Sequence, residues 1–339
     1  MSRIAIIGGG AWGTGLAIVL GRKGSHRVRL WAHEPDVCDS INHKHVNQRF
    51  LPGSRIPESV SASNDLASVV EGAEILVSVM PSQHCRGLFA RLGRMIPRQA
   101  LIVSATKGLE EGSLLRMSEV IGDALTHDDH LQPRVGALSG PSFAQEVARG
   151  DPTAITVASG DPGLLRAVQQ EFSDAAFRVY TNTDIIGVEL GGALKNIIAI
   201  AAGICDGLGL GHNSVAALIT RGLAEMTRLT VACGGRAETM AGLAGLGDLV
   251  LTCTGGLSRN RSVGAELGRG KKLPEIIPAM HGMVAEGVFT TTAAVGLARA
   301  RGVEMPITEQ MHAILHEGKS PHEAIQELMT RSGKNEIAN

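Results

Sequence analysis

Three glycines near the N-terminus have the spacing of a phosphate-binding turn. Gly8, Gly10 and Gly13 follow the pattern G-x-G-x-x-G, directly after an apolar run over residues 3–7 and before a helical stretch that reaches Leu20. The first glycine permits a tight turn, the second lets the backbone approach a pyrophosphate, and the third lets a helix pack closely on a strand. The N–H groups that begin the helix attract an anion. This context predicts a dinucleotide-binding loop, and the alternative is a glycine-rich turn without a ligand.

A lysine lies in the middle of an apolar segment, the predicted helix over residues 184–205. The helical neighbours of Lys195 are small or apolar: Gly191, Gly192, Ile198 and Ala199. Burial disfavours the charged form of a lysine, so a lysine in such a pocket can act as a base near neutral pH. A lysine that extends to the surface is the alternative, and the spacing alone leaves both open.

The residues after the second predicted strand bear on the choice of cofactor. NAD-binding folds usually place an acidic residue about 20 residues after the glycines, where it binds the ribose 2′-hydroxyl. Here that position holds Ala32 or His33, and Glu34 follows. His33 can lie beside a 2′-phosphate, although Glu34 can still turn inward. We therefore expect NAD or NADP, with NADP slightly favoured.

The glycines and the lysine fall in two regions of different character. Apolar runs typical of buried strands alternate with helical stretches in the first region, at residues 3–7, 27–31, 73–79, 100–104, 135–138, 153–158 and 176–180. This alternation predicts a doubly wound parallel sheet. Beyond about residue 183 the spacing is helical, at residues 184–205, 214–233, 261–268, 291–301, 308–317 and 321–330. We predict an α/β Rossmann-type domain over residues 1–187 and an all-α substrate-binding domain over residues 188–339.

Composition argues against several classes of protein. The 339 residues carry a formal net charge of −1, unlike a nucleic-acid binder that works through bulk positive charge. The apolar segment over residues 185–204 contains Glu189, Lys195 and Asn196, whose cost in lipid favours a buried helix over membrane insertion. The N-terminal residues run straight into glycines and lack the apolar region of a signal peptide. Five cysteines without a CxxC motif indicate reduced thiols and a cytoplasmic location.

Paired histidines raise the question of a metal site. The pairs are His43 and His45, His127 and His130, and His312 and His316. His312 and His316 are four residues apart, but the glutamate of the HExxH pattern is missing. We expect no metal.

Several motifs occur together and in order along the chain. They are Gly8–Gly13 followed by Thr14, the segment over residues 47–53, Ser104–Gly108, Leu138–Ala144, Gly192–Asn196, Gly245–Leu249, Thr252, Ser258–Asn260 and Val284–Gly287. With these motifs the chain resembles the NAD(P)-dependent glycerol-3-phosphate dehydrogenases of the bacterial biosynthetic type. The motifs span nearly the whole chain and are specific as a set, although no single one is.

The resemblance implies reversible hydride transfer between dihydroxyacetone phosphate and sn-glycerol 3-phosphate, which feeds glycerophospholipid synthesis. The lysine that matches Lys195 accepts and donates the proton at the substrate C2 oxygen in that family, and Lys107, Asp248 and Thr252 match residues around the same centre. The implied substrate-binding residues are Lys107, Gly140, Ser142, Lys195, Asn196, Asp248, Ser258, Arg259 and Asn260. The cofactor-binding residues assigned by motif or resemblance are Gly8, Gly10, Ala11, Trp12, Gly13, His33, Lys107, Ala144, Arg259, Val284 and Glu286. Many relatives have serine in place of Ala11, so only a backbone contact is expected there.

These residue types suit the implied chemistry. Ketone reduction needs a hydride, which a nicotinamide supplies, and a proton for the developing alkoxide. Lys195 can donate that proton, Lys107 can stabilise the oxyanion, and Asp248 can orient Lys195. Asp248 and Thr252 share one face if their stretch is helical. The run from Ser258 to Asn260 precedes a helical stretch and so offers a phosphate an arginine and a helix N-terminus.

Two other interpretations remain open from the sequence. A lysine-dependent dehydrogenase of the β-hydroxyacid or 6-phosphogluconate type would share the glycine loop and the helix lysine, but it would bind a carboxylate. A module that senses NAD(H) and regulates a partner would need the loop but neither Lys195 nor Asp248. The sequence also leaves a homodimer open.

Overall fold

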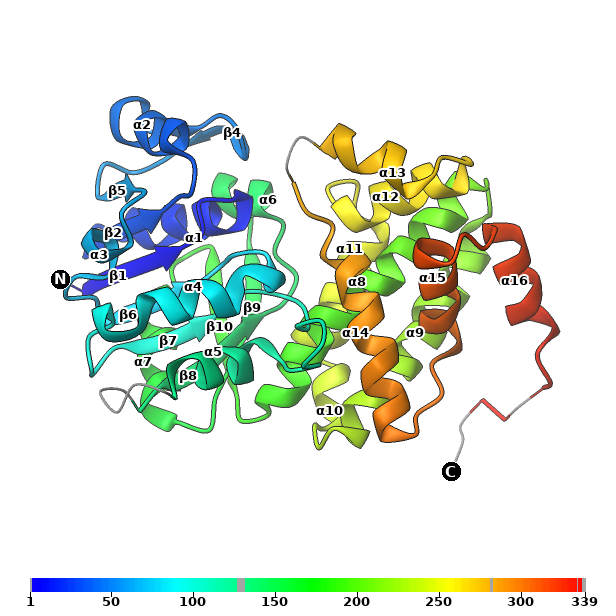
Figure 1. Cartoon of the computed structure of the whole chain (residues 1–339). Coiled ribbons are helices and arrows are strands. Elements are labelled where there is room, and N and C mark those ends of the chain that lie inside the picture. Colours follow the sequence, from blue (N-terminus) through cyan, green and yellow to red (C-terminus); the bar gives the residue numbers. More distant parts are fainter. Residues whose placement is uncertain (1, 127–131, 281–282, 334, 337–339) are drawn as a thin grey trace.

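The computed structural model describes residues 2–126, 132–280, 283–333 and 335–336, so His127 and His130 lie outside the described residues. A sheet with helices on both faces lies beside a region built from helices (Figure 1). The strands are β1 (Ser2–Ile7), β2 (His26–Trp31), β3 (Val46–Asn47), β4 (Leu51–Arg55), β5 (Val60–Ser63), β6 (Ile75–Ser78), β7 (Leu101–Ser104), β8 (Arg134–Ser139), β9 (Thr153–Ala158) and β10 (Phe177–Asn182).

The helices divide between the two regions in chain order. Those of the sheet region are α1 (Ala11–Arg22), α2 (Pro35–Lys44), α3 (Leu66–Val70), η1 (Ser82–His84), α4 (Cys85–Leu92), η2 (Gly93–Met95), α5 (Met117–Leu125), α6 (Ala144–Arg149) and α7 (Pro162–Phe172). Those of the helical region are α8 (Ile185–Gly207), α9 (His212–Ala232), α10 (Ala237–Met240), the π-helical turn η3 (Leu243–Gly247), α11 (Asp248–Thr254), α12 (Arg259–Gly268), α13 (Leu273–Ile276), η4 (Ile277–Met280), α14 (Glu286–Arg301), α15 (Pro306–His316) and α16 (Pro321–Thr330). The expected α/β domain followed by a helical domain is confirmed.

The sheet has a hydrophobic core on each face, because side chains alternate along a buried strand. In β1, Ile4 and Ile6 belong to one core, which α1 and α7 complete. Ala5 and Ile7 belong to the other, which α3, α4 and α5 complete. The strand order is β10-β9-β8-β7-β6-β1-β2-β5, so both strands beside β1 reach it by crossover connections, as in a doubly wound fold.

One pair of strands corrects the expectation of a parallel sheet, since β8 and β9 are antiparallel. The connection after β8 stays at the carboxyl edge of the sheet, where its helix α6 packs against α1. A chain that does not cross back must re-enter the sheet from the same edge and therefore run in the opposite direction. The short strands β3, β4 and β5 were also not predicted, and each contains at most five residues.

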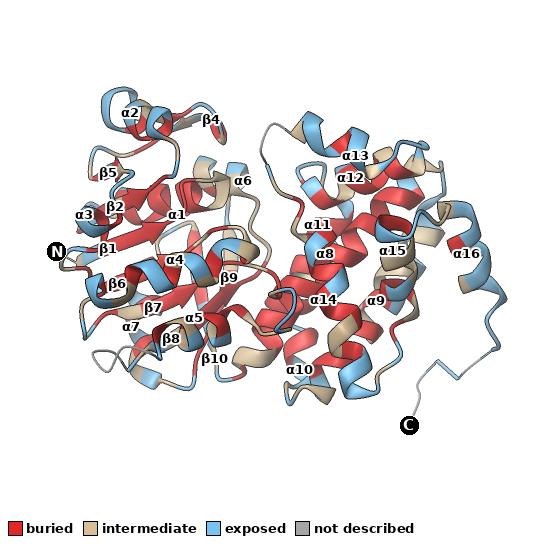
Figure 2. Cartoon of the chain, in the orientation of Figure 1, coloured by how far each residue is buried: buried red, intermediate tan, exposed pale blue. Residues whose placement is uncertain are grey.

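Helix α8 is the centre of the helical domain. It has the length and mean hydropathy (1.6) of a membrane span, but 83% of that apolar window is buried inside the protein. Figure 2 shows it as a buried element between the sheet and the other helices. Because α8 is covered on all sides, it can be apolar around its whole circumference. The expected buried helix is therefore confirmed, and its few polar side chains need partners inside the protein.

Helices α8 and α12 approach so closely that their backbones touch. A Cβ atom added at Gly203 would lie 2.0 Å from the carbonyl oxygen of Arg261, and one at Gly264 would lie 1.9 Å from the carbonyl oxygen of Ile200. Small residues on both helices therefore set this crossing. As a result, the N-terminus of α12 lies against the middle of α8.

We expect Gly264→Ala to lower the free energy of unfolding by about 3 kcal/mol or more, because backbone atoms must move to admit the methyl group. Gly122→Ala in α5 is the matched control, since a Cβ there meets nothing within 4 Å, and it should stabilise the protein by roughly 0.5 to 1 kcal/mol. Urea denaturation of both variants measures the two effects. Equal stability of the two variants would contradict the close helix crossing.

Candidate active site

The three glycines of the loop between β1 and α1 differ in what surrounds them. Gly8 has φ +133°, and a Cβ there would lie 2.1 Å from the carbonyl oxygen of Val79. A Cβ at Gly13 would lie 1.9 Å from the carbonyl oxygen of Gly8. At Gly10 a Cβ would meet no atom of the described chain within 4 Å. Packing thus explains Gly8 and Gly13, whereas Gly10 borders open space at the start of α1, where a pyrophosphate would bind.

An asparagine that sequence reasoning assigned no role holds this loop in place. The Asn47 side-chain amide donates to the carbonyl oxygen of Gly9 at 2.9 Å and to the hydroxyl of Thr14 at 2.8 Å. Asn47 is fully buried. It lies in a segment that the resemblance singled out, but only the fold brings this segment to the glycines.

The other residues predicted around the loop lie on α1, α6 and the end of β2. Ala11 and Trp12 begin α1, and the buried indole nitrogen of Trp12 has no hydrogen-bond partner among the described residues. Ala144 begins α6 and packs against α1 beside Gly15. His33 follows β2 and is exposed. The open space at Gly10, the helix N-terminus and the unpaired indole N–H fit a dinucleotide at this edge.

The predicted catalytic residues form one cluster, in which Lys195, Asp248 and Thr252 are buried and Lys107 is partly exposed. The Lys195 ammonium donates to Asp248 Oδ1 at 2.5 Å and to the Thr252 hydroxyl at 2.7 Å. The Lys107 ammonium donates to Asp248 Oδ2 at 2.6 Å. Asp248 therefore bridges two lysines that come from α8 and from the loop after β7. Asp248 and Thr252 share a face of α11, as expected for a helical stretch.

Burial and charge act against each other in this cluster. Burial lowers the pKa of Lys195 to about 8, with Lys107 adding to the shift and Asp248 opposing it. Burial alone would raise the pKa of the Asp248 carboxyl, but the two lysines outweigh it and the pKa is lowered. Asp248 is thus a stable anion, and Lys195 can gain or lose a proton near neutral pH.

Gly140 and Ser142 lie beside Lys107 at the end of β8. The Gly140 carbonyl oxygen accepts hydrogen bonds from the Lys107 ammonium at 3.3 Å and from the Ser142 hydroxyl at 2.9 Å. Gly140 has φ +141°, and a Cβ there would lie 2.9 Å from Cα of Ile155. A glycine is therefore required where the backbone turns toward the lysine.

Asparagines join the start of α12 to α8 and α14. The Asn260 amide donates to Asn196 Oδ1 at 3.0 Å, and Asn260 Oδ1 accepts from the Gly287 backbone N–H at 3.0 Å. The Ser258 hydroxyl caps α12 by accepting from the backbone N–H of Arg261. Its neighbour Arg259 is exposed at the same helix end.

The two remaining predicted residues lie at the start of α14. Val284 is half-buried. The Glu286 carboxylate accepts from the Ser82 hydroxyl at 2.6 Å and from the Ser82 backbone N–H at 3.2 Å. Burial raises the pKa of Glu286, while Ser82 and Arg259 oppose that shift. Ser82 follows β6, so this contact links the helical domain to the sheet edge; no sequence motif pointed to it.

Comparison with known proteins identifies the family of this chain. Residues 3–164 match the model of the NAD-dependent glycerol-3-phosphate dehydrogenase N-terminus, and residues 184–326 match that of the C-terminus. The chain belongs to this family. The resemblance noted from the sequence is therefore confirmed.

Individual relatives match over nearly their whole length. A glycerol-3-phosphate dehydrogenase [NAD(P)+] of Koribacter versatilis is 65% identical over 337 residues, which cover 99% of each chain. The enzyme of that name from Geobacter sulfurreducens is 52% identical over 98% of each chain. The crystal structure of glycerol-3-phosphate dehydrogenase from Coxiella burnetii has a TM-score of 0.92 and 45% identity, and the match covers 97% of this chain and 99% of that one.

The open space beside Gly10 leads to a prediction about cofactor affinity. We expect Gly10→Ala to fold with nearly unchanged stability, because its Cβ meets no protein atom, and to bind NADH and NADPH at least roughly tenfold more weakly, because the methyl group occupies the ligand's space. Quenching of protein fluorescence by the cofactor gives the affinity, and thermal denaturation is the control. Unchanged affinity for both cofactors would mean that the pyrophosphate binds elsewhere.

Proposed function

We propose that this protein transfers a hydride reversibly between NAD(P)H and dihydroxyacetone phosphate, giving sn-glycerol 3-phosphate for glycerophospholipid synthesis. The observation that carries the proposal is the Lys195–Asp248–Lys107 cluster. Lys107 follows β7, two strands from β1 in the sheet, so the cluster lies about 10 Å along the sheet edge from the glycine loop. A dinucleotide bound at that loop can extend toward it. Family membership supports the same activity.

The lysines supply the proton chemistry of the reaction. When bound, the cofactor supplies or accepts the hydride at its nicotinamide ring. Lys195 donates a proton to the C2 oxygen in reduction and accepts it in oxidation. Lys107 stabilises negative charge on that oxygen. Asp248 holds both ammonium groups, and Thr252 orients Lys195 by accepting its second hydrogen bond.

The substrate phosphate is assigned to the start of α12. Arg259 is exposed there, and Ser258 and Asn260 lie on either side of it. Helix N-termini and arginine side chains both favour a phosphate. Asn196 accepts a hydrogen bond from Asn260 and is next to Lys195 in sequence. This pair therefore connects the proposed phosphate site to the proton donor. Gly140 and Ser142 complete the substrate site at Lys107.

The cofactor is assigned to Gly8, Gly10, Ala11, Trp12, Gly13, His33, Lys107, Ala144, Arg259, Val284 and Glu286. We further propose a slight preference for NADP. His33 is exposed at the end of β2, and the Arg49 guanidinium lies 3.8 Å from the carboxylate of Asp36 in the first turn of α2. The imidazole and the guanidinium offer a 2′-phosphate hydrogen-bond donors, and Arg49 also carries a positive charge.

We place the enzyme in the cytoplasm and retain a homodimer as its assembly. All five cysteines lie in the described part of the chain and are free, which suits a reducing compartment. Exposed apolar side chains of the helical domain, such as Leu257 and Ile277, are consistent with a homodimer. Light scattering of the purified chain tests the assembly, and a monomeric mass would reject it.

The activity and the role of Lys195 are tested together. The protein should oxidise NADH and NADPH in the presence of dihydroxyacetone phosphate, with NADPH the faster. Lys195→Ala should lower kcat by about 10³-fold or more, because the proton donor is lost, and leave cofactor affinity nearly unchanged. Absorbance at the nicotinamide band measures turnover. Lys271→Ala, in the exposed segment that follows α12, is the control and should keep full activity.

Two outcomes would reject the proposal. Retained kcat in Lys195→Ala would remove the assigned proton donor. Absence of turnover in protein that binds the cofactor would point to a carboxylated substrate.

The pH dependence follows from the lowered pKa of Lys195. Oxidation of glycerol 3-phosphate needs the neutral amine as a base, so kcat should rise as the pH increases through about 8. Reduction needs the ammonium form, so its kcat should fall over the same interval. Initial rates in both directions from about pH 7 to about pH 9 test this. Parallel slopes in the two directions would contradict the assignment.

A further inference from the structure

Helix α8 carries a buried carboxylate that takes no part in the proposed chemistry. The Glu189 side chain is only 5% exposed. Its Oε1 accepts from the Ser118 backbone N–H at 2.7 Å, and its Oε2 accepts from the Ser118 hydroxyl at 2.6 Å and from the Arg116 guanidinium at 2.5 Å. All three donors belong to the sheet domain, so Glu189 joins the two domains.

These contacts tie down the start of α5. Arg116 is the N-terminal capping residue of α5, and Ser118 lies in its first turn. N–H groups in a first turn have no acceptor within their own helix, so Glu189 supplies one from the other domain. The Arg116 guanidinium also donates to Glu119 at 2.7 Å, which places it between two carboxylates.

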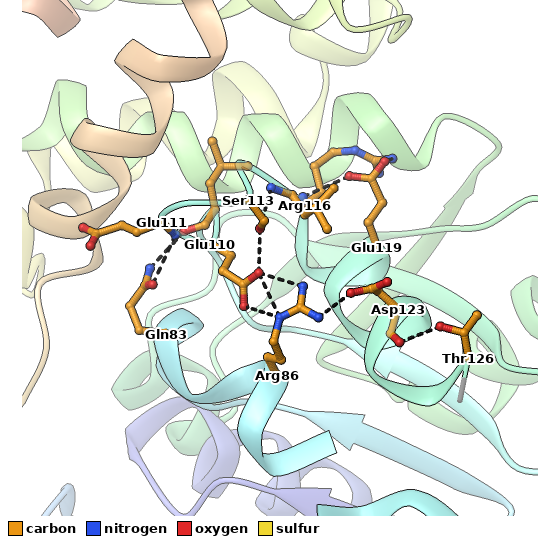
Figure 3. Close-up of polar contacts among 11 residues, drawn as sticks. Gln83, Arg86, Glu110, Glu111, Ser113, Arg116, Glu119, Asp123 and Thr126 are labelled. Atoms are coloured by element: carbon orange, nitrogen blue, oxygen red, sulfur yellow. Dashed lines mark hydrogen bonds and ion pairs between the residues drawn. The ribbon is translucent and has the colours of Figure 1, made fainter. Parts of the chain in front are cut away.

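The segment from Lys107 to Arg116, called here the 107–116 loop, is short and is held together by hydrogen bonds within its own backbone. The Glu110 backbone N–H donates to the Leu115 carbonyl, and the Leu114 N–H donates to the Glu110 carbonyl, both at 3.0 Å. Arg86 holds the Glu110 carboxylate from α4, as Figure 3 shows. Because these hydrogen bonds stiffen the loop, a displacement of its Arg116 end also displaces its Lys107 end.

The other end of the 107–116 loop also lies against α8. The Cγ atom of Lys107 is 3.6 Å from the Cβ position of Gly192, and its ammonium is bonded to Asp248. Glu189, Gly192 and Lys195 are spaced by three residues, so each step turns about 60° around the helix and the three span about 9 Å of its length. The loop thus contacts α8 at two points, and Lys195 projects beside the second.

We propose that Glu189 is a positioning residue: it clamps the 107–116 loop to α8 and so holds Lys107 in place beside Asp248 and Lys195. This inference rests on the proposed roles of Lys107 and Lys195. A buried ion pair usually adds little net stability compared with apolar side chains of the same size. The Glu189–Arg116 ion pair instead fixes geometry, because the two lysines come from different domains and must meet at one carboxylate.

The test is a double-mutant cycle between Glu189→Gln and Lys107→Met. Glu189→Gln keeps the size of the side chain but lacks the charge that holds Arg116. We expect it to lower kcat about tenfold, as loss of alignment does. In the Lys107→Met background the same change should lower kcat less than about twofold, because the residue through which it acts is gone. In the Glu189→Gln single variant, the rise of glycerol 3-phosphate oxidation with pH should also move to higher pH. A displaced Lys107 ammonium no longer disfavours the positive charge on Lys195.

Glu225→Gln is the matched control. Glu225 is a buried carboxylate of α9 that accepts from the backbone N–H groups of Ile307 and Thr308 and from the Thr308 hydroxyl, far along the chain from the 107–116 loop. It should lower thermal stability without changing kcat or the pH profile. If Glu189→Gln does not fold, Ser118→Ala removes one hydrogen bond to the same carboxylate and enters the same cycle, with a smaller expected loss of about threefold.

The possible failures are distinguishable. Equal losses in both backgrounds, or no loss at all, would overturn the clamp while leaving the proposed function intact. A loss of kcat in Glu225→Gln equal to that in Glu189→Gln would show that general destabilisation is the cause. Full activity of Lys107→Met would instead remove the proposed role of Lys107, and the clamp with it.

Discussion

The arrangement of this protein depends on one buried carboxylate held between two lysines. Two ammonium groups held close together repel each other, and each loses hydration as it becomes buried. Asp248 reverses this balance because each of its oxygens accepts a hydrogen bond from one lysine. The carboxylate belongs to α11, one lysine to α8 and the other to a loop of the sheet domain. The centre therefore exists only when both domains and three chain segments are in place.

The need to bring these segments together explains features of the fold that otherwise look incidental. Helix α8 is buried on all sides, so Lys195 has no route to solvent along its own helix and needs an internal partner. Glycines of α8 and α12 let the two backbones touch, which brings the Asn260 amide to Asn196. Glu189 and Glu286 both accept hydrogen bonds across the domain interface, from Arg116 and Ser118 and from Ser82. Contacts that join the domains thus include those that surround the chemistry.

The sequence predicted local patterns well and long-range pairing poorly. The glycine loop, the buried helix with its lysine and the shared face of Asp248 and Thr252 depend on residues within a few positions of each other. The pairing of Lys107 with Asp248 joins residues 141 apart, and only the resemblance to a family suggested it. No local signal marks Asn47 or Ser82 as partners of the glycine loop and Glu286. The antiparallel direction of β9 was not predicted, because the apolar pattern of a buried strand is the same for either direction of the chain.

The charges around the proposed active site suit a substrate that carries a phosphate. Lys107, Lys195 and Arg259 supply three positive charges, and Asp248 and Glu286 supply up to two negative ones. Burial raises the pKa of Glu286, which further favours an excess of positive charge. Such an excess attracts a phosphate dianion. Asp248 limits that excess at the reacting atoms, where a lysine without a carboxylate partner would lose its proton too readily to serve as the acid. The same carboxylate thus stabilises the site and leaves Lys195 able to work in both directions of the reaction.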